Sequence, residues 1–598
     1  KSIDYLAFKG CSSIETISIP SNVTSIGEFA FSDCKSLKNI WIPPSVKSIG
    51  EYAFNNCDSL VCMSIPGTVD WIGDFLFNSC SNLKSVIISD GVEEIGNWIF
   101  SNCRDIESIT LPFAGHSAEG VSKNDTRAIS GSLFCQYASD EGYLPSYEYE
   151  EGYYYPGLEA RCVPLSLRNI TITGGEAIPS YAFAGLSSVT TISLPDTITV
   201  INNNAFEDCI KIIDVDFIPE SVTKINDEAF ARCSGIKNVI IPDKVEFIGE
   251  RAFTDCINLK DISLSTSLSA INKETFSNCI NLCEINIPAN VYSIEEFPFN
   301  NCDSLTNITI PSNVQTIGDY VFNSCSNLET VVITGGVKKI GEWIFSNCRS
   351  IKSITLPFAG HSAIEVAENN ERTIGGTLFC QYAPDEGYKN NYEYDEKYYY
   401  GGYEWRCVPK SLKNITILGG EAIPSYAFAG LSSVTNISLP STVTTIRNNA
   451  FDDCIKLESL NILESVTTIE NEAFKNCQAL KQLKICNPNA IIDSNEETIP
   501  NTTTIYGYSD STAQKYADKY KCDFISLGEY NTSATLIGDC DFNGKIESDD
   551  IEYLCKYLLG EETINRNQWL NSDINQDGSV NVFDMILMRC ILIEINSM

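Results

Sequence analysis

The sequence has few histidines, no long apolar segment and a shortage of positive charge, and each absence narrows its function. Only His116 and His361 occur among 598 residues, which limits histidine-based catalysis and zinc chemistry. No run of about 18 apolar residues is present, so no segment is expected to span a bilayer. There are 41 Lys and Arg against 78 Asp and Glu, and the net charge of −37 argues against partners such as nucleic acid or an anionic membrane surface.

The rest of the composition is that of a folded protein. Hydrophobic residues make up 43% and charged residues 20% of the chain, which excludes wholesale disorder. A chain of 598 residues is too long for one compact core, so we expect several domains or a repeat array. No signal peptide is recognisable and the chain opens at Lys1 inside a repeat. We therefore expect that residues upstream were removed or never included.

Cysteines mark an internal repeat of 23 residues. Around each lies the pattern Ala-Phe-x-x-Cys-x-x-Leu-x-x-Ile-x-Ile-Pro, in which the alternating apolar residues predict a short strand with one buried face. Proline then ends the strand, because it cannot donate to a ladder of hydrogen bonds. One such unit cannot bury its apolar face alone, but stacked units can. The regularly spaced cysteines are Cys11, Cys34, Cys57, Cys80 and Cys103, then Cys233, Cys256, Cys279, Cys302, Cys325 and Cys348, and finally Cys454 and Cys477.

The 25 cysteines allow two interpretations. In a secreted protein they suggest disulfides or metal ligands. At the repeat position they also fit the role of small buried apolar residues. Leu186 and Leu431 fill the cysteine position in two units, and leucine replaces a packed thiol but neither a bridge nor a ligand. The sequence therefore favours buried, free cysteines in the repeats.

The repeat pattern resembles the BspA-type leucine-rich repeat family of bacterial surface and secreted proteins, over residues 1–488. The resemblance implies an α/β repeat solenoid with a parallel sheet on one face. It also implies an adhesion or interaction protein without a common enzyme activity.

A larger duplication, with an offset of 245 residues, overlies the small repeat: Cys57 recurs as Cys302 and Cys209 as Cys454. Each half contains an island, at residues 112–163 and 357–408, in which the short rhythm is lost. Each island carries an acidic, tyrosine-rich loop that we interpret either as a ligand surface for sugars or protein, or as a cover over the interrupted solenoid. The candidate ligand residues are Tyr153, Tyr154, Tyr155, Tyr398, Tyr399, Tyr400 and Trp405.

Four island cysteines lie off the repeat position. Cys135 with Cys162, and Cys380 with Cys407, are candidates for disulfides, although free thiols remain the alternative. Each island has one histidine in a turn-like context, where a structural hydrogen bond is favoured over catalysis.

The segment that follows the repeats has a different pattern. Residues 504–508 predict a strand and residues 511–517 a short helix, and together they resemble the C-terminal cap of the same family, at residues 489–527. A cap is needed because the last turn would otherwise expose its apolar face. Residues 528–536 are predicted to be a linker.

The tail contains two oxygen-rich loops, 539–550 and 573–584, with oxygen side chains at positions 1, 3, 5, 9 and 12 and glycine at position 6. Calcium takes about six to eight oxygen ligands, and glycine at position 6 allows the chain to turn around the ion. Position 7 contributes a backbone carbonyl, so the lysine side chain of Lys545 at this position is compatible with calcium binding. The pattern predicts two Ca2+ ions, held by Asp539, Asp541, Asn543, Lys545, Glu547 and Asp550, and by Asp573, Asn575, Asp577, Ser579, Asn581 and Asp584.

Each loop leads into an apolar helix, at residues 551–559 and 585–593, and aspartate replaces the usual glutamate at position 12. Such paired units resemble a dockerin of a bacterial cellulosome, here residues 537–598, a small all-α calcium-binding domain. The resemblance implies binding to a cohesin domain of a scaffoldin. Its contact positions map onto Ser548, Asp549, Cys555 and Lys556 in the first unit, and onto Val582, Phe583, Arg589 and Cys590 in the second. The two sets differ, which suggests one docking orientation, although Val582 is equally well interpreted as a core residue.

These features favour a secreted, non-catalytic interaction protein, held on a cellulosome or cell surface by calcium-dependent docking, with its repeat surface offered to a protein or glycan. The alternative is a carbohydrate-active component of a polysaccharide-degrading complex. That component would bind carbohydrate through the islands, or would have lost a catalytic module upstream of Lys1.

Overall fold

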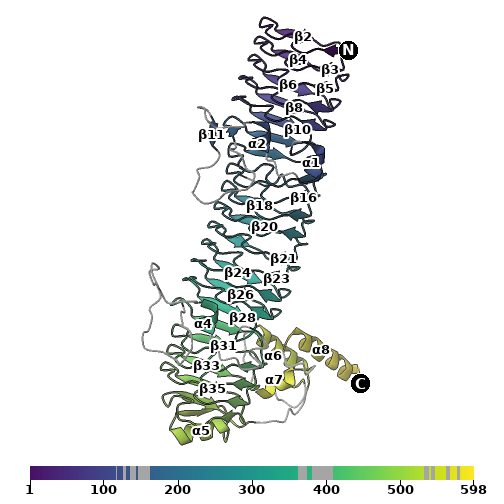
Figure 1. Cartoon of the computed structure of the whole chain (residues 1–598). Helices are drawn as coiled ribbons and strands as arrows, with labels where there is room; N and C mark the ends of the chain where they lie inside the picture. The colour runs from purple at the N-terminus through teal and green to yellow at the C-terminus, as the bar shows by residue number, and fades with distance from the viewer. Residues whose placement is uncertain are drawn as a thin grey trace, which may run out of the picture.

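The computed structural model of the chain describes residues 1–115, 117–124, 129–134, 143–145, 162–213, 215–360, 362, 374–379, 409–530, 538–540, 546–559, 566–574 and 580–597. Figure 1 shows an elongated solenoid that ends at the cap helix α5 (Thr512–Tyr520), and the helices α6 (Ser548–Leu558), α7 (Arg566–Ser572) and α8 (Val582–Ser597) of the tail. The solenoid has about 19 turns of parallel strands, which confirms the predicted repeat architecture. Within the described ranges, no helix has the length and apolar character needed to cross a membrane.

One face of the solenoid is built from the longer strand of each turn. In β6, Met63 and Ile65 are buried while Cys62 and Ser64 are exposed, as the alternating pattern predicts. The strands form several consecutive parallel sheets, and within each sheet the strand of one turn pairs with the strand of the next, for example Cys62 with Ser85. The strands of this face are β2 (Thr16–Ser18), β4 (Asn39–Trp41), β6 (Cys62–Ile65), β8 (Ser85–Ile88), β10 (Ser108–Leu111), β13 (Asn169–Ile172), β15 (Thr191–Ser193), β18 (Asn238–Ile240), β20 (Asp261–Ser263), β22 (Glu284–Ile285), β24 (Asn307–Ile310), β26 (Thr330–Ile333), β28 (Ser353–Leu356), β29 (Asn414–Ile417), β31 (Asn436–Ser438), β33 (Ser459–Ile462), β35 (Gln482–Ile485), β37 (Thr504–Gly507) and β38 (Phe524–Ser526).

A second face is built from two-residue parallel strands, which adds to the single sheet expected from the sequence. The isoleucine or other apolar residue of each strand is mostly buried, for example Ile49, which pairs with Ile72. These strands are β1 (Ser2–Ile3), β3 (Ser25–Ile26), β5 (Ser48–Ile49), β7 (Trp71–Ile72), β9 (Glu94–Ile95), β14 (Ala177–Ile178), β16 (Val200–Ile201), β17 (Lys224–Ile225), β19 (Phe247–Ile248), β21 (Ala270–Ile271), β23 (Ser293–Ile294), β25 (Thr316–Ile317), β27 (Lys339–Ile340), β30 (Ala422–Ile423), β32 (Thr445–Ile446), β34 (Thr468–Ile469) and β36 (Ile491–Ile492).

The core between the faces contains a ladder of phenylalanines and a ladder of cysteines. The rings of Phe31 and Phe54 stack with centroids 5.5 Å apart. Cys57 Sγ donates to the carbonyl oxygen of Phe31 at 3.3 Å, and Cys80 Sγ repeats this contact with Phe54 at 3.1 Å. The regularly spaced cysteines are all free, and all but Cys11 are fully buried. The interpretation as small buried residues is therefore confirmed for them.

The islands do not interrupt the pairing of the longer strands. β10 pairs directly with β13, with Ser108 opposite Asn169, and β28 pairs in the same way with β29. In the first island, α2 (Ile129–Leu133) places Phe134 on the phenylalanine ladder, 5.6 Å from Phe100. In the second, α4 (Ile374–Phe379) places Phe379 at the same distance from Phe345. Each island is thus a turn of the solenoid that carries extra residues.

The two-residue strands, in contrast, are not continuous at the islands. Beyond β9 the chain forms α1 (Ala118–Ser122), and Glu94 makes an isolated antiparallel bridge to Ser117. β14 then begins a new sheet. The first island also contains the antiparallel pair β11 (Tyr143–Pro145) and β12 (Cys162–Pro164).

The strand and helix expected after the repeats are both present. β37 pairs with β35, and Ser511 caps α5 by accepting a hydrogen bond from the amide of Gln514 at 3.2 Å. Tyr516 of α5 donates its hydroxyl to the carbonyl oxygen of Asn495 at 2.7 Å, which fixes the helix over the last turn.

Candidate functional site

Each predicted calcium loop is closed by the aspartate at its twelfth position. In the first loop, Asp550 accepts hydrogen bonds from the amides of Cys540 at 2.7 Å and Glu547 at 2.9 Å, one at each carboxylate oxygen. In the second loop, Asp584 accepts in the same way from Ile574 at 2.9 Å and Asn581 at 2.8 Å. The described ends of the two loops are therefore held in the same way by a buried carboxylate.

The described part of each loop fits a hard cation. A carboxylate has about four lone-pair sites, so a carboxylate that accepts two amide hydrogen bonds, as Asp550 and Asp584 do, is also able to bind a cation. Asp539 and Asp573, at the first loop positions, are also buried. Buried carboxylates are costly unless they are paired or bind a metal ion. These residues could hold Ca2+ together with the other oxygen-bearing positions of the loops.

The loop interiors lie outside the described residues. Glu547 and Asn581 are described, whereas the predicted ligands outside are Asp541, Asn543, Lys545, Asn575, Asp577 and Ser579. Within the described ranges, no three acidic, cysteine or histidine side chains come together as a metal site. The complete ligand sets thus stay predictions.

The helices after the loops begin earlier than expected. α6 (Ser548–Leu558) and α8 (Val582–Ser597) both include the aspartate at position 12 in their first turn. Glu547 and Asp550 form a capping box in α6, in which each side chain accepts a hydrogen bond from the other residue's backbone. Loop closure and helix initiation therefore depend on the same carboxylate.

A helix that the sequence analysis missed connects the two loops. α7 (Arg566–Ser572) ends directly before Asp573. The backbone carbonyl of Asn571 accepts a hydrogen bond from the backbone amide of Gly538 at 2.7 Å. The side-chain amide of Asn571 donates a hydrogen bond to the backbone carbonyl of Asp539 at 2.6 Å. The starts of both loops are thus held at one end of α7. These contacts span more than 30 residues, and no local sequence signal indicates them.

The three helices share a small apolar core. Cys540, Leu554 and Met588 are fully buried, with Ile551, Tyr553, Tyr557, Leu558, Ile574, Val580 and Met585 packed around them. Cys555 is half-buried, with its Sγ atom 3.1 Å from Met585 Sδ. This core is small, so ion binding is expected to supply much of the stability of the tail.

The exposed surfaces of α6 and α8 differ in chemistry. On α6, Ser548 and Asp549 are exposed and Lys556 pairs with Glu552 at 2.8 Å. On α8 the corresponding surface is apolar: Val582 is 56%, Ile586 49% and Leu587 38% exposed, and Arg589 lies beside them in sequence. Interpreting Val582 as a core residue is therefore wrong. Ile586 and Leu587 were not among the predicted contacts, although the four-residue spacing of Ile586 from Val582 places Ile586 on the same face of the helix.

Several other predicted features lie outside the described residues. They are Tyr153, Tyr154, Tyr155, Tyr398, Tyr399, Tyr400 and Trp405, both histidines, and Cys135, Cys380 and Cys407; the side chains of Cys162, Phe583 and Cys590 are also outside. The tyrosine surfaces and the island disulfides therefore stay predictions.

Comparisons with known families agree with this division of the chain. The family described as "BspA type Leucine rich repeat region (6 copies)" matches residues 1–119, 162–282, 246–367 and 407–507. The family described as "Dockerin type I domain" matches residues 537–592. No curated protein matches the sequence. Domains of the second family generally bind calcium and cohesin, and both families are typical of extracellular, cell-surface or cellulosomal proteins.

Solved structures with similar folds include two bacterial proteins. A leucine-rich repeat protein from Bacteroides ovatus is 18% identical, with 86% of this chain and 92% of that chain covered and a TM-score of 0.34. A leucine rich cell surface protein from Faecalibacterium prausnitzii is 20% identical, with 81% and 89% covered and a TM-score of 0.25. Likeness at this level carries no information about function.

Proposed function

Because the chain belongs to the BspA-type leucine-rich repeat family and ends in a type I dockerin domain, we propose that it is a non-catalytic interaction protein anchored to a scaffoldin. The dockerin binds a cohesin domain in a calcium-dependent manner, and the solenoid is offered to a protein or glycan. The observation that carries this proposal is the matching closure of the two loops by Asp550 and Asp584 within the dockerin region. The protein acts outside the cell, on a cellulosome or the cell surface.

Two Ca2+ ions support the docking surface. The equal hydrogen-bond patterns at Asp550 and Asp584 favour two equivalent sites over one. Each ion compensates the buried negative charge of its loop and so fixes the start of α6 or α8. Removal of calcium leaves those carboxylates uncompensated and unfolds the tail.

Docking occurs in one preferred orientation, with α8 at the centre of the interface. Interface centres are depleted in charge and depend on a few well-packed apolar or aromatic anchors. Val582, Ile586 and Leu587 supply such a surface on α8, and Arg589 adds a polar contact at its side. At the same helical positions α6 has Ser548, Glu552, Tyr553 and Cys555. A dockerin bound in the reverse orientation, with α6 in the place of α8, would therefore present different side chains to the cohesin.

Calorimetry with a panel of type I cohesins tests the proposal. With calcium present we expect saturable binding of at least one cohesin, and with excess chelator we expect none. Hydrogen exchange on the same samples should show that chelation exposes the amides of residues 538–597 while the solenoid stays protected. Cohesin binding that survives chelation contradicts the proposal.

A further inference from the structure

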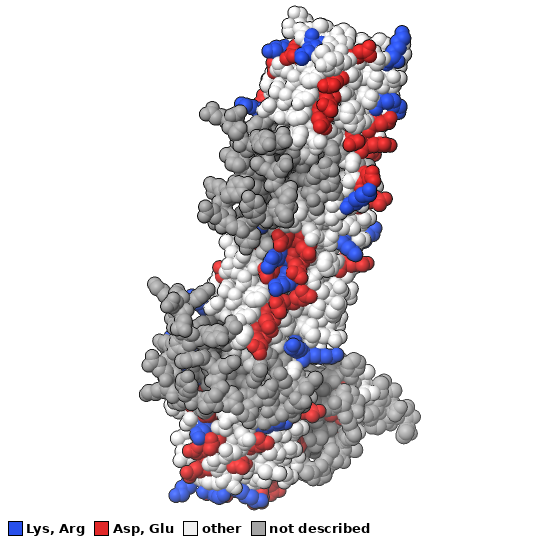
Figure 2. Space-filling view, viewed as in Figure 1, with Lys and Arg blue, Asp and Glu red and all other residues white. Residues whose placement is uncertain are grey.

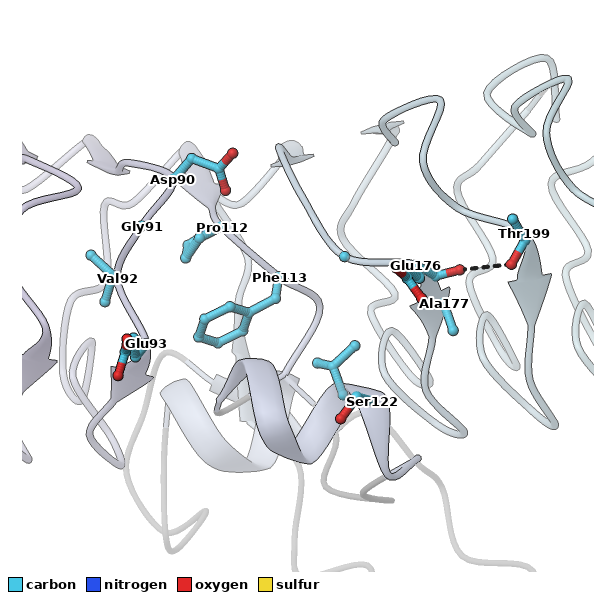
Figure 3. A pocket seen from close by; sticks show the side chains of 12 residues that line it. Asp90, Gly91, Val92, Glu93, Pro112, Phe113, Ser122, Glu176, Ala177 and Thr199 are labelled. Carbon is cyan, nitrogen blue, oxygen red and sulfur yellow. Dashed lines mark hydrogen bonds between the residues drawn. The ribbon is translucent and has the colours of Figure 1, made fainter.

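Two surface features of the solenoid are explained by contacts within the chain. In the turns between the islands, Figure 2 shows a stripe of acidic and basic side chains, where ion pairs such as Arg251 with Glu274 at 2.6 Å compensate the charges. Beside the first island a cleft is lined by Phe113 and by Ser122 of α1 (Figure 3), and α1 and Ser117 lie against β14 and β9 there. Neither feature requires a partner from outside the chain. The tail differs, because its contacts connect two predicted ion sites.

Asn571 of α7 connects the starts of the two calcium loops. It lies two residues before Asp573, the first position of the second loop. Its side-chain Nδ2 donates to the backbone carbonyl of Asp539, the first position of the first loop, at 2.6 Å. Its backbone carbonyl accepts from Gly538, whose φ of +100° favours glycine and brings the two segments together. One residue therefore holds the segments at which both predicted sites begin.

A second contact extends this connection to the residues that close the loops. Ser572 Oγ donates to Cys540 Sγ at 3.1 Å, and both side chains are fully buried. Asp550 holds the amide of Cys540 at 2.7 Å, and in the second loop Asp584 holds the amide of Ile574 at 2.9 Å. Cys540 and Ile574 also pack in the same apolar core. A continuous series of contacts thus joins one closing carboxylate to the other.

The burial of the Asn571 amide is costly, which makes its position informative. The side chain is fully buried, and its Oδ1 atom makes no hydrogen bond within the described part of the chain. A buried carbonyl without a hydrogen bond costs free energy that an apolar side chain of similar size would avoid. Packing alone therefore does not favour asparagine here. The contribution that requires the amide is the Nδ2 bond to the first loop.

These contacts link the ordering of one loop to the ordering of the other. The apolar core of the tail is small, so ion binding and folding depend on each other. An ion that orders one loop also fixes Asn571, and through it the start of the other loop. The second ion then binds a loop that has less conformational entropy to lose, which is positive cooperativity.

We propose that Asn571 couples the two calcium sites, so that the ions bind cooperatively and the docking surface forms over a narrow range of calcium concentration. Asn571 is a positioning residue, because it transmits the ordering of one loop start to the other. This inference rests on the proposed function, which requires both loops to bind calcium, but it can fail while cohesin docking holds.

The test is a double-mutant cycle on the full chain, with calcium affinities measured by competition against a chromophoric chelator. In the wild type, the second ion should bind about 10-fold more tightly than the single ion of Asp584→Asn, a coupling of 1.4 kcal/mol after correction for the number of sites. With Asn571→Leu in both chains, which keeps the size of the side chain but removes the donor, that difference should fall below about 2-fold.

Hydrogen exchange gives a readout that does not depend on affinities. In the wild type, the amides of Cys540 and Ile574 should gain protection together and steeply as calcium is added, and in Asn571→Leu with the shallower dependence of independent sites. The matched control is Gln568→Leu, which removes a side-chain amide of the same helix that donates to Tyr553 of α6 at 2.9 Å. That variant should keep the 10-fold coupling of the wild type.

Three outcomes overturn the proposal: no tighter binding of the second ion in the wild type, full coupling in Asn571→Leu, or an equal loss of coupling in Gln568→Leu. If Asn571→Leu binds no calcium, Ser572→Ala takes its place in the cycle, because it removes only the contact with Cys540, and full coupling there overturns the proposal. A wild-type chain that binds no calcium refutes the proposed function instead, and cohesin capture on each sample reports on docking separately.

Discussion

The backbone amide of Cys540 donates a 2.7 Å hydrogen bond to Asp550 Oδ1, so the second residue of the loop is tied to the last. The other oxygen of Asp550 accepts from Glu547, the residue that precedes α6. One buried carboxylate therefore closes the loop and starts the helix. Because Asp584 makes the same contacts in the second loop, each unit has its own closing residue.

Replacing either closing residue should remove one calcium ion. In Asp550→Asn the side-chain nitrogen cannot accept the amide hydrogen bond, and the charge that attracts the ion is lost. We expect calorimetry to show one ion bound in place of two, and a tail destabilised by about 2 kcal/mol. Asp584→Asn should give the same result and the double variant no binding. Asp549→Asn, at an exposed neighbouring position, should still bind two ions, and a loss there would contradict the assignment.

The sequence was sufficient for features whose signals are local or repeated. The spacing of a calcium loop singled out Asp550 and Asp584, and the structure shows that both are buried and close their loops, while their binding of calcium stays a prediction. The free cysteines were predicted because Leu186 and Leu431 replace them. Contacts between distant segments were not predictable. The bond from Asn571 to the Asp539 carbonyl depends on how α7 packs. The positions of Phe134 and Phe379 on the phenylalanine ladder were not predictable either, because they follow from how the turns stack.

The docking orientation can be tested by paired substitutions on the two helices. Ile586→Glu places a charge in the exposed apolar surface of α8 without touching the buried core. We expect cohesin binding to weaken by about 2 kcal/mol, the size of a typical hot-spot effect. Glu552→Gln changes the equivalent position on α6 and should alter binding by less than about 0.5 kcal/mol. If the α6 variant binds more weakly than the α8 variant, the proposed orientation is wrong.

The islands should contribute to solenoid stability through their phenylalanines. Phe134 is fully buried and its ring packs against Phe100 at a tilt of 33°, so Phe134→Ala removes a ring from the ladder. We expect the free energy of unfolding, measured with urea, to fall by about 3–5 kcal/mol. Phe134→Leu, which fills more of the space, should lose clearly less. Equal stability of the alanine variant and the wild type would show that the island turn is not part of the core.

The buried thiols should make the solenoid sensitive to alkaline pH. Burial raises the pKa of Cys103 from 9.0 to about 12, because the thiolate would lose its hydration in the core. Between these values the folded state keeps a proton that the unfolded state releases, so the free energy of unfolding falls as pH rises. The loss is about 1.4 kcal/mol per pH unit for each such thiol, and it is absent well below pH 9. Urea titrations at pH 8 and pH 10 should therefore differ less in Cys103→Leu, which copies the natural leucine units, by about 1.4 kcal/mol. Cys62 is exposed, so the control variant Cys62→Leu should keep the pH dependence of the wild type. An equal effect of Cys103→Leu and Cys62→Leu on the pH dependence would rule out burial of the thiol as its cause.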